Sequence, residues 1–183
     1  MKKFSRRARV ATGGVVLATV AAGTVGAVSA GASEPAAAQG RPAAVKPSDT
    51  VTSTHLSVAA ATEAAEAVLD AARKENQRVS VAVVDRNGNT LVTLRGDGAG
   101  PQSYESAVRK GFTAVSWNAP TSVLAERLEQ TPNLKDIPGT LFLAGGAPVT
   151  SGNAPIAGIG VAGAPSGALD EKFARAGVAA LTR

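Results

Sequence analysis

The sequence predicts an α+β layered domain over residues 51–183, in which an antiparallel sheet is flanked by helices. Three observations indicate this class. An alanine-rich helical segment comes first, an Asn-Gly turn joins two runs of β-branched residues, and a helical segment closes the chain. Antiparallel strands that are grouped together and covered by separate helices are typical of α+β proteins. A domain of about 130 residues is an ordinary size for one hydrophobic core.

The first predicted element is a helix over residues 56–77, which are rich in alanine with charged residues spaced through them. Thr54 or Ser57 is expected to cap its start, because a hydroxyl oxygen there can accept a hydrogen bond from an unpaired N–H group. Asn76 is expected near its end.

A β-hairpin follows. Residues 79–85 are β-branched and predict a strand, and residues 90–95 predict its returning partner. Asn87-Gly88 lies between them and predicts a two-residue type I′ turn, since both positions of that turn need positive φ. Residues 96–101 are glycine-rich and predict a loop.

Two helices come next. One is predicted from about Ser103 to Trp117. Pro120 is expected to open the other, which ends near Gln130, because proline suits the first helical turn. Residues 134–139 then predict a loop.

The last part of the domain is predicted to contain three strands and a helix. The strands are placed at residues 140–144, 148–150 and 156–162, with Gly145-Gly146 turning the chain between the first two. Three glycines within or beside the last strand indicate the close approach of another backbone or of a ligand. Residues 168–181 predict the closing helix.

Residues 1–32 have the three-part pattern of an export signal. Five basic residues lie within the first ten, an uncharged run follows over residues 10–28, and Ala30-Gly31-Ala32 provides the small residues before a cleavage site. Ser5-Arg6-Arg7 resembles the twin-arginine signal of bacteria, although Arg9 stands where that signal usually has a bulky apolar residue. We therefore expect an extracellular protein exported by the twin-arginine or the general secretory route. A retained membrane anchor is the alternative.

Residues 33–50 are rich in alanine and proline and predict a flexible tether. Five of the 19 Lys and Arg residues lie in the signal, which leaves 14 against 14 Asp and Glu residues in the mature chain. Neutrality argues against a nucleic-acid partner, because phosphate binding needs a concentrated positive face. The sequence has no cysteine, so the domain depends on its core, with oligomerisation as a further source of stability.

Few residues offer the usual catalytic chemistry. His55 is the single histidine, at the edge of the tether, where we expect it to be solvated. Two Glu-x-x-Glu pairs are candidates for a hard cation or ferric iron, since residues three apart share a helix face. The pairs are Glu63 with Glu66 and Glu126 with Glu129, and a charged solvent face is the alternative for each.

The second helix has two distinct sides by helical spacing. One is expected to face the core and consists of Tyr104, Ala107, Val108, Gly111, Phe112 and Val115. The other consists of Ser106, Arg109, Lys110, Thr113 and Trp117. Two cations beside an aromatic surface suit a flat anionic ligand whose carboxylates bind Arg109 and Lys110. The alternative is a solvent face with the tryptophan at a subunit contact.

Five segments of this chain resemble the GlcG/HbpS family, and within it the secreted streptomycete branch. They span nearly the whole domain in order and lie at residues 81–88, 94–107, 113–121, 137–146 and 157–167. The resemblance implies a profilin-like domain, a homo-octamer, haem binding, and haem degradation with iron release. It also implies partnership with a membrane sensor histidine kinase that responds to haem and oxidative stress.

The resemblance further implies axial ligation of haem iron by a threonine hydroxyl, which maps to Thr113 within the intact segment 110–117. Arg109 or Lys110 is then expected near the haem propionates. A hydroxyl is a weak, hard ligand, which we expect to hold ferric haem loosely. Non-haem iron is a further candidate ligand, with the two Glu-x-x-Glu pairs as its candidate sites.

Three hypotheses for function remain at this point. The first is an exported haem-binding accessory to a sensor kinase, with slow haem breakdown as a side activity. The second is an enzyme whose main task is haem degradation. The third is a module of the same fold that binds a different small molecule.

Overall fold

A computed structural model describes residues 43–182 of the chain. The predicted export signal and residues 33–42 of the predicted tether lie outside the described residues. Contacts divide the chain into two units, residues 1–47 and residues 48–183. Within residues 43–182, no helix has the length and apolar character needed to cross a membrane. The second unit carries all the helices and strands discussed below.

The centre of the domain is a four-stranded antiparallel sheet, which confirms the predicted α+β class. Its strands are β1 (Ser80–Asp85), β2 (Thr90–Arg95), β3 (Gly146–Ser151) and β4 (Ala154–Ala162), in the order β2-β1-β4-β3. The central pair places Val81 opposite Val161 and Val83 opposite Ile159. All six residues of β1 are buried, as expected for a central strand covered on both faces.

The β1–β2 hairpin is present, but its predicted type I′ turn is wrong. Gly88 has a φ of +88°, whereas Asn76 and Asn118 are the non-glycine residues with positive φ in the described part of the chain. The N–H of Gly88 donates to the carbonyl of Asp85 over 3.0 Å. The Asp85 carboxylate accepts from the N–H groups of Asn87 and Asn89, each over 2.8 Å. This side-chain acceptor stabilises a longer turn in which one residue has positive φ.

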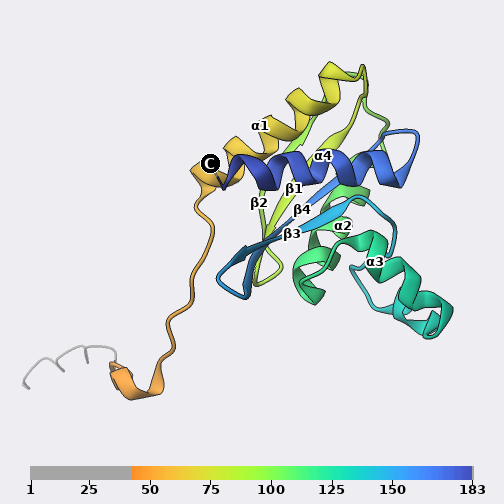
Figure 1. The fold of residues 1–183 in the computed structure, drawn as a ribbon. Helices are drawn as coiled ribbons and strands as arrows, with labels where there is room; N and C mark the ends of the chain where they lie inside the picture. Colours follow the sequence, from red (N-terminus) through yellow and green to blue (C-terminus); the bar gives the residue numbers. More distant parts are fainter. Residues whose placement is uncertain (1–42, 183) are drawn as a thin grey trace, which may run out of the picture. The chain divides into compact units, whose positions relative to one another are not determined.

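Two helices cover one face of the sheet, as Figure 1 shows. They are α1 (Val58–Lys74) and α4 (Gly167–Ala180), and they pack against each other. Ser57 Oγ caps α1 by accepting from the N–H of Ala60, as predicted. Residues of α1 at helical spacing form the core with the facing side chains of the strands. The α1 members of that core are Ala61, Ala64, Ala65, Val68, Leu69 and Ala72.

Helix α2 (Ser103–Trp117) covers the opposite face and has the predicted bounds. It lies directly on β4, where Gly158 and Gly160 leave no side chain between strand and helix. A Cβ atom at Gly160 would overlap the carbonyl oxygen of Ala107 and the backbone nitrogen of Gly111. The glycines of β4 therefore mark the close approach of another backbone, as the sequence predicted.

The chain between α2 and β3 is mostly irregular. Helix α3 (Thr121–Glu126) follows Pro120 and continues as two 3₁₀ turns, at Arg127–Glu129 and Pro132–Asp136. The predicted strand at residues 140–144 is wrong, because this segment has no strand neighbour. Instead, the carbonyl of Thr140 and the N–H of Leu141 are hydrogen-bonded to side chains of α2.

Candidate functional site

Thr113 lies in the middle of α2, on its side toward the segment at residues 140–142. Its hydroxyl donates to the carbonyl oxygen of Arg109 over 2.8 Å and accepts from the N–H of Leu141 over 2.8 Å. The side chain is fully buried, with 0% exposure. A hydroxyl has one proton and two lone pairs, so one lone pair of Thr113 Oγ1 remains for another donor or for a metal.

Arg109 lies one helical turn before Thr113 and is half-buried. Its Nη2 donates to the carbonyl oxygen of Thr140 over 2.8 Å. The guanidinium has five N–H donors in a planar fork, so this single bond leaves most of its donors for an anionic group. Arg109 and Thr113 are thus brought together, as predicted.

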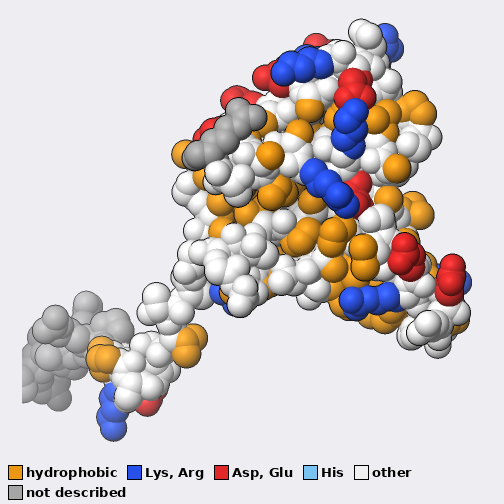
Figure 2. Space-filling view, viewed as in Figure 1, with side chains coloured by type: hydrophobic (Ala, Val, Ile, Leu, Met, Phe, Trp, Pro, Cys, Tyr) orange, Lys and Arg blue, Asp and Glu red, His pale blue; other side chains and the backbone are white. Residues whose placement is uncertain are grey.

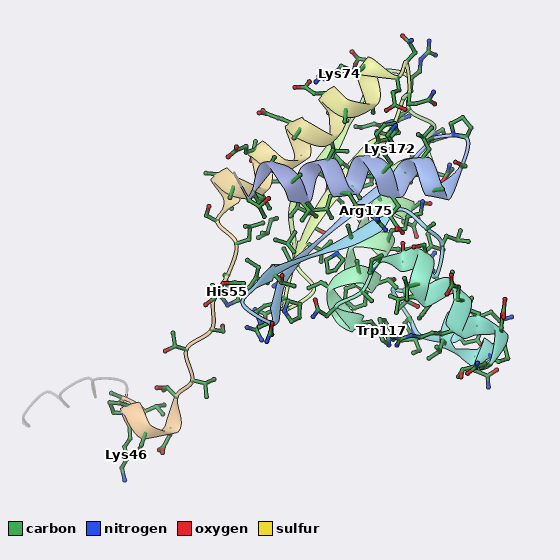
Figure 3. All side chains as sticks on the ribbon, in the orientation of Figure 1. Lys46, His55, Lys74, Trp117, Lys172 and Arg175 are labelled. Atoms are coloured by element: carbon green, nitrogen blue, oxygen red, sulfur yellow. The ribbon has the colours of Figure 1, made fainter. Side chains whose placement is uncertain are left out.

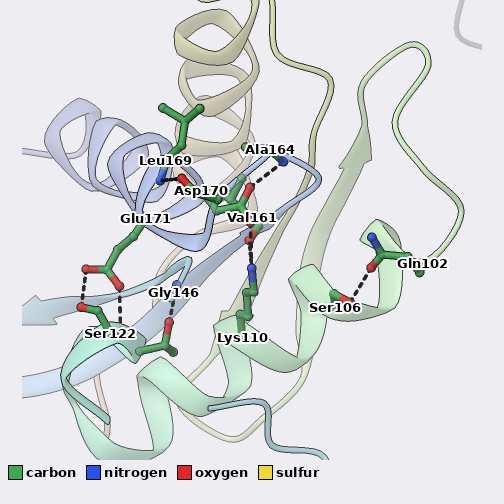
Figure 4. Close-up of polar contacts among 12 residues, drawn as sticks. Gln102, Ser106, Lys110, Ser122, Gly146, Val161, Ala164, Leu169, Asp170 and Glu171 are labelled. Carbon is green, nitrogen blue, oxygen red and sulfur yellow. Dashed lines mark hydrogen bonds and ion pairs between the residues drawn. The ribbon is translucent and has the colours of Figure 1, made fainter. Parts of the chain in front are cut away.

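Lys110 does not join them, and its predicted placement beside Arg109 is wrong. Its Nζ is 2.8 Å from Asp170 Oδ2 of α4 and 3.0 Å from the carbonyl oxygen of Val161, to which it donates (Figure 4). The Lys110 and Asp170 side chains are only 6% and 5% exposed. Burial raises the pKa of Asp170 more than the bonds from Lys110 and from the Ala164 N–H lower it. The lysine therefore ties α2 to β4 and α4.

The buried side of α2 also differs from the predicted one. Its buried residues are Ser103, Ala107, Lys110, Gly111, Thr113, Ala114 and Val115. Tyr104, predicted to be in the core, is 51% exposed. Lys110 follows Ala107 by three positions and precedes Ala114 by four, and this spacing was the available signal that it faces inward.

Aromatic side chains lie near Thr113. The rings of Trp117 and Phe142 meet edge to face with their centroids 5.2 Å apart. Figure 3 shows Trp117 at the end of α2, away from Lys172 and Arg175 on α4. Phe112 lies near two glycines of different loops, since a Cβ at Gly88 or Gly139 would come within 4 Å of its ring. These rings offer apolar surface of the kind that packs on a flat ligand.

Glu171 is a second buried carboxylate, which the sequence did not single out. It accepts from the N–H and the hydroxyl of Ser122, over 2.9 and 2.8 Å (Figure 4). It also accepts from Arg175 Nη2 over 2.7 Å. Desolvation raises the pKa of Glu171, but these hydrogen bonds outweigh it and hold the pKa below its ordinary value. Glu171 therefore joins α4 to the start of α3, a structural role.

His55 lies in the segment before α1 (Figure 3), and its Nε2 is 2.7 Å from Ser53 Oγ. Desolvation raises the pKa of Asp85, but hydrogen bonds from Asn89 and Asn87 and the charge of His55 outweigh it and lower the pKa overall. His55 is exposed, as expected, and interacts electrostatically with Asp85 at the hairpin turn.

The two Glu-x-x-Glu pairs occupy different elements. Glu63 and Glu66 are exposed on α1, while Glu126 ends α3 and Glu129 ends the following 3₁₀ turn, both exposed. Within residues 43–182, no group of three or more His, Asp or Glu side chains is arranged to hold a metal ion. A cavity of about 310 Å³ lies at the end of α1, lined by Arg73, Arg78 and Asp97 among others, and no predicted site residue borders it.

A sequence profile described as "Haem degrading protein HbpS-like" matches residues 56–179. Among curated proteins, no sequence matches the chain.

Solved structures of HbpS and of a related protein are also similar to this chain. One is a variant of Streptomyces reticuli HbpS in which two glutamates, three residues apart, are replaced by aspartate. It is 71% identical to this chain with a TM-score of 0.76, and the match covers 76% of this chain and 96% of that one. A structure of HbpS is 72% identical with a TM-score of 0.74, covering 75% and 97%. A complex of PduOC with haem is 25% identical with a TM-score of 0.64, covering 69% and 95%.

Proposed function

The chain belongs to the HbpS-like family of haem-degrading proteins, and on that premise we propose that it binds ferric haem on α2 through the hydroxyl of Thr113. The observation that carries the proposal is the pairing of Thr113 Oγ1, which has an unused lone pair, with the Arg109 guanidinium one turn away. The haem complex of PduOC, a structural relative, supports the same class of ligand.

The side chains present fit a haem in their chemistry. A hydroxyl oxygen is a hard ligand suited to ferric iron, and a guanidinium forms charge-assisted bonds with carboxylates such as the propionates. Phe112 and Trp117 supply apolar surface for the macrocycle. Bound haem supplies redox chemistry at its iron. Lys110 is left out of this site, because its ammonium is buried against Asp170.

A titration of the full chain with haemin tests the proposal. A Soret band at a defined stoichiometry is expected. Thr113→Ala should weaken binding and shift the band, because iron loses its oxygen ligand. Arg109→Ala should weaken binding without that shift, since it removes a contact worth about 1.5–3 kcal/mol when buried and less where solvent reaches it.

His55→Ala is the control and should leave the spectrum unchanged. If His55→Ala abolishes the band while Thr113→Ala leaves it intact, the ligand assignment is wrong. If no Soret band forms with the unaltered chain, the alternative of a module for a different small molecule takes the place of haem binding.

We further propose that the protein is exported and acts with a sensor kinase. The N-terminal pattern supports export, and the family resemblance supports an accessory role for a membrane sensor histidine kinase that responds to haem and oxidative stress. Replacing Arg6 and Arg7 by lysine should block export by the twin-arginine route, and undiminished export would reject that route. Haem-loaded and haem-free chain should change the kinase's autophosphorylation rate differently, and equal rates would reject the partnership.

Haem degradation is the second candidate function, and the description of the family favours it. Sustained iron release over many turnovers would identify an enzyme, whereas stoichiometric binding without release would identify a carrier or sensor. Glu63 and Glu66 are our candidates for a non-haem iron site, since both are exposed one turn apart on α1. Replacing both by glutamine should then remove iron binding measured in the absence of haem, and unchanged binding would exclude this pair.

A further inference from the structure

The segment between the 3₁₀ turn at Pro132–Asp136 and β3 lies against α2, and we call its residues 137–145 the strap. Two of its backbone groups are hydrogen-bonded to side chains of α2. The N–H of Leu141 donates to Thr113 Oγ1, and the carbonyl oxygen of Thr140 accepts from Arg109 Nη2, each over 2.8 Å. The side chains that hold the strap are therefore the same two that the proposed function assigns to haem.

Packing strengthens this contact. Thr140 and Phe142 are 1% and 4% exposed, and the Phe142 ring meets Trp117 of α2 edge to face. Leu143 is 57% exposed. The strap thus buries two of its side chains and presents others to solvent.

Glycines with positive φ stand on both sides of this contact. Gly139 has a φ of +80° and Gly145 a φ of +132°. The carbonyl oxygen of Gly145 accepts from the N–H of Val161 over 2.8 Å, which fixes that end of the strap to β4. A short segment between two such residues can change its path by rotation at the glycines while its ends stay in place.

With the strap closed, haem cannot reach the remaining lone pair of Thr113 Oγ1. Thr113 is fully buried with the strap in place, so a ligand as large as haem has no path to its hydroxyl. We propose that the strap gates the haem site: it closes over Thr113 and Arg109, and it must lift from α2 before haem reaches them. This inference rests on the proposed function, because the strap is a gate only if those side chains bind haem.

The gate makes a kinetic prediction. Haem binds the open form, so the association rate depends on how often the strap is open. The apparent affinity is likewise reduced by the fraction of molecules in which the strap is closed. A change that destabilises the closed strap, and alters neither Thr113 nor Arg109, should therefore speed haem binding.

Gly139→Ala is such a change, and Gly152→Ala is its matched control. Both put a Cβ on a residue with positive φ, +80° and +59°. Neither meets a close contact, since the Cβ at position 139 would lie 3.6 Å from Phe112 and that at position 152 has nothing within 4 Å. The backbone strain is thus similar, but only Gly139 belongs to the strap. Phe142→Leu, which removes the ring contact with Trp117, is an independent second variant.

The rate of Soret-band formation is measured after rapid mixing of the full chain with excess monomeric haemin. We expect Gly139→Ala to bind haemin about five- to thirtyfold faster than the unaltered chain. This ratio corresponds to the energy by which a left-handed backbone conformation destabilises an alanine in the closed strap. Phe142→Leu should also be faster, and Gly152→Ala should match the unaltered chain. Equal rates in all four proteins would overturn the gate while leaving haem binding intact. Absence of the band in every protein would instead overturn the proposed function, and the gate with it.

Discussion

Lys110 and Asp170 form an ion pair that joins residues 60 positions apart in the sequence. Both charges are almost entirely removed from water, and each has a further hydrogen bond, from Lys110 Nζ to the Val161 carbonyl and from the Ala164 N–H to Asp170 Oδ1. Such a pair adds little net stability over apolar residues of the same size, but the loss of one partner leaves an uncompensated buried charge. Its main effect is to fix α2 against β4 and α4.

Lys110→Met should therefore lower the free energy of unfolding by about 3–5 kcal/mol, measured by urea denaturation at neutral pH. Arg73→Met is the matched control, since the Arg73–Asp70 pair has side chains 66% and 63% exposed and should contribute under about 1 kcal/mol. The double variant Lys110→Met with Asp170→Leu should recover most of the loss. Equal costs at positions 110 and 73 would contradict this account.

The pH dependence of the Lys110→Met variant has a definite sign. Removal of the ammonium raises the already raised pKa of Asp170 further, because desolvation is then opposed by fewer partners. A carboxyl with a raised pKa in the folded state costs stability as the pH rises through that pKa. The deficit of the variant should therefore shrink as the pH falls toward 3.8, the ordinary value for Asp.

Individual contacts of Thr113 and Lys110 were only partly predictable from sequence. The pairing of Thr113 with Arg109 follows from helical spacing, because residues four apart lie on one side of a helix. The bonds from Leu141 to Thr113 and from Lys110 to Asp170 join residues 28 and 60 positions apart, and no local pattern encodes them.

Among the elements, β4 and α2 are held closer together than side chains would allow. Gly158 and Gly160 of β4 lie against the backbone of α2 at Ala107 and Gly111. The sequence predicted this approach from glycines inside a strand, a place where they are otherwise unfavourable. The strand predicted at residues 140–144 from their apolar run is absent. Side chains of α2 form the hydrogen bonds to this backbone that a neighbouring strand would otherwise form.

Gly160→Ala tests the contact between β4 and α2. Its Cβ would overlap backbone atoms of Ala107 and Gly111, which cannot move without shifting the whole helix. We expect a loss of about 3 kcal/mol or more in the free energy of unfolding. Gly100→Ala is the control, since a Cβ there has no heavy atom within 4 Å and should change stability by less than about 1 kcal/mol. Equal stability of the two variants would show that β4 and α2 are not in backbone contact.

At the scale of the whole molecule, several large apolar side chains remain in contact with solvent. Tyr104, Val123 and Leu143 are 51%, 45% and 57% exposed. Figure 2 shows hydrophobic side chains between the charged side chains of α4 and those of α3. A domain without cysteine gains stability when such surface is covered by further copies of itself. This exposure favours self-association, and the family resemblance implies that the assembly is a homo-octamer.

Multi-angle light scattering of the full chain at micromolar concentration should give the mass of a homo-oligomer, with eight copies as the expected number. Closed symmetric assemblies are the usual outcome for soluble homo-oligomers, so the mass should stay constant as the protein is diluted within that range. Deletion of residues 33–48 should not change the number of copies, because six of the seven exposed large apolar side chains among the described residues lie outside that segment, Val45 being the seventh. A monomeric mass for the full chain would reject the assembly, and a smaller assembly for the deletion variant would instead place the predicted tether in the interface.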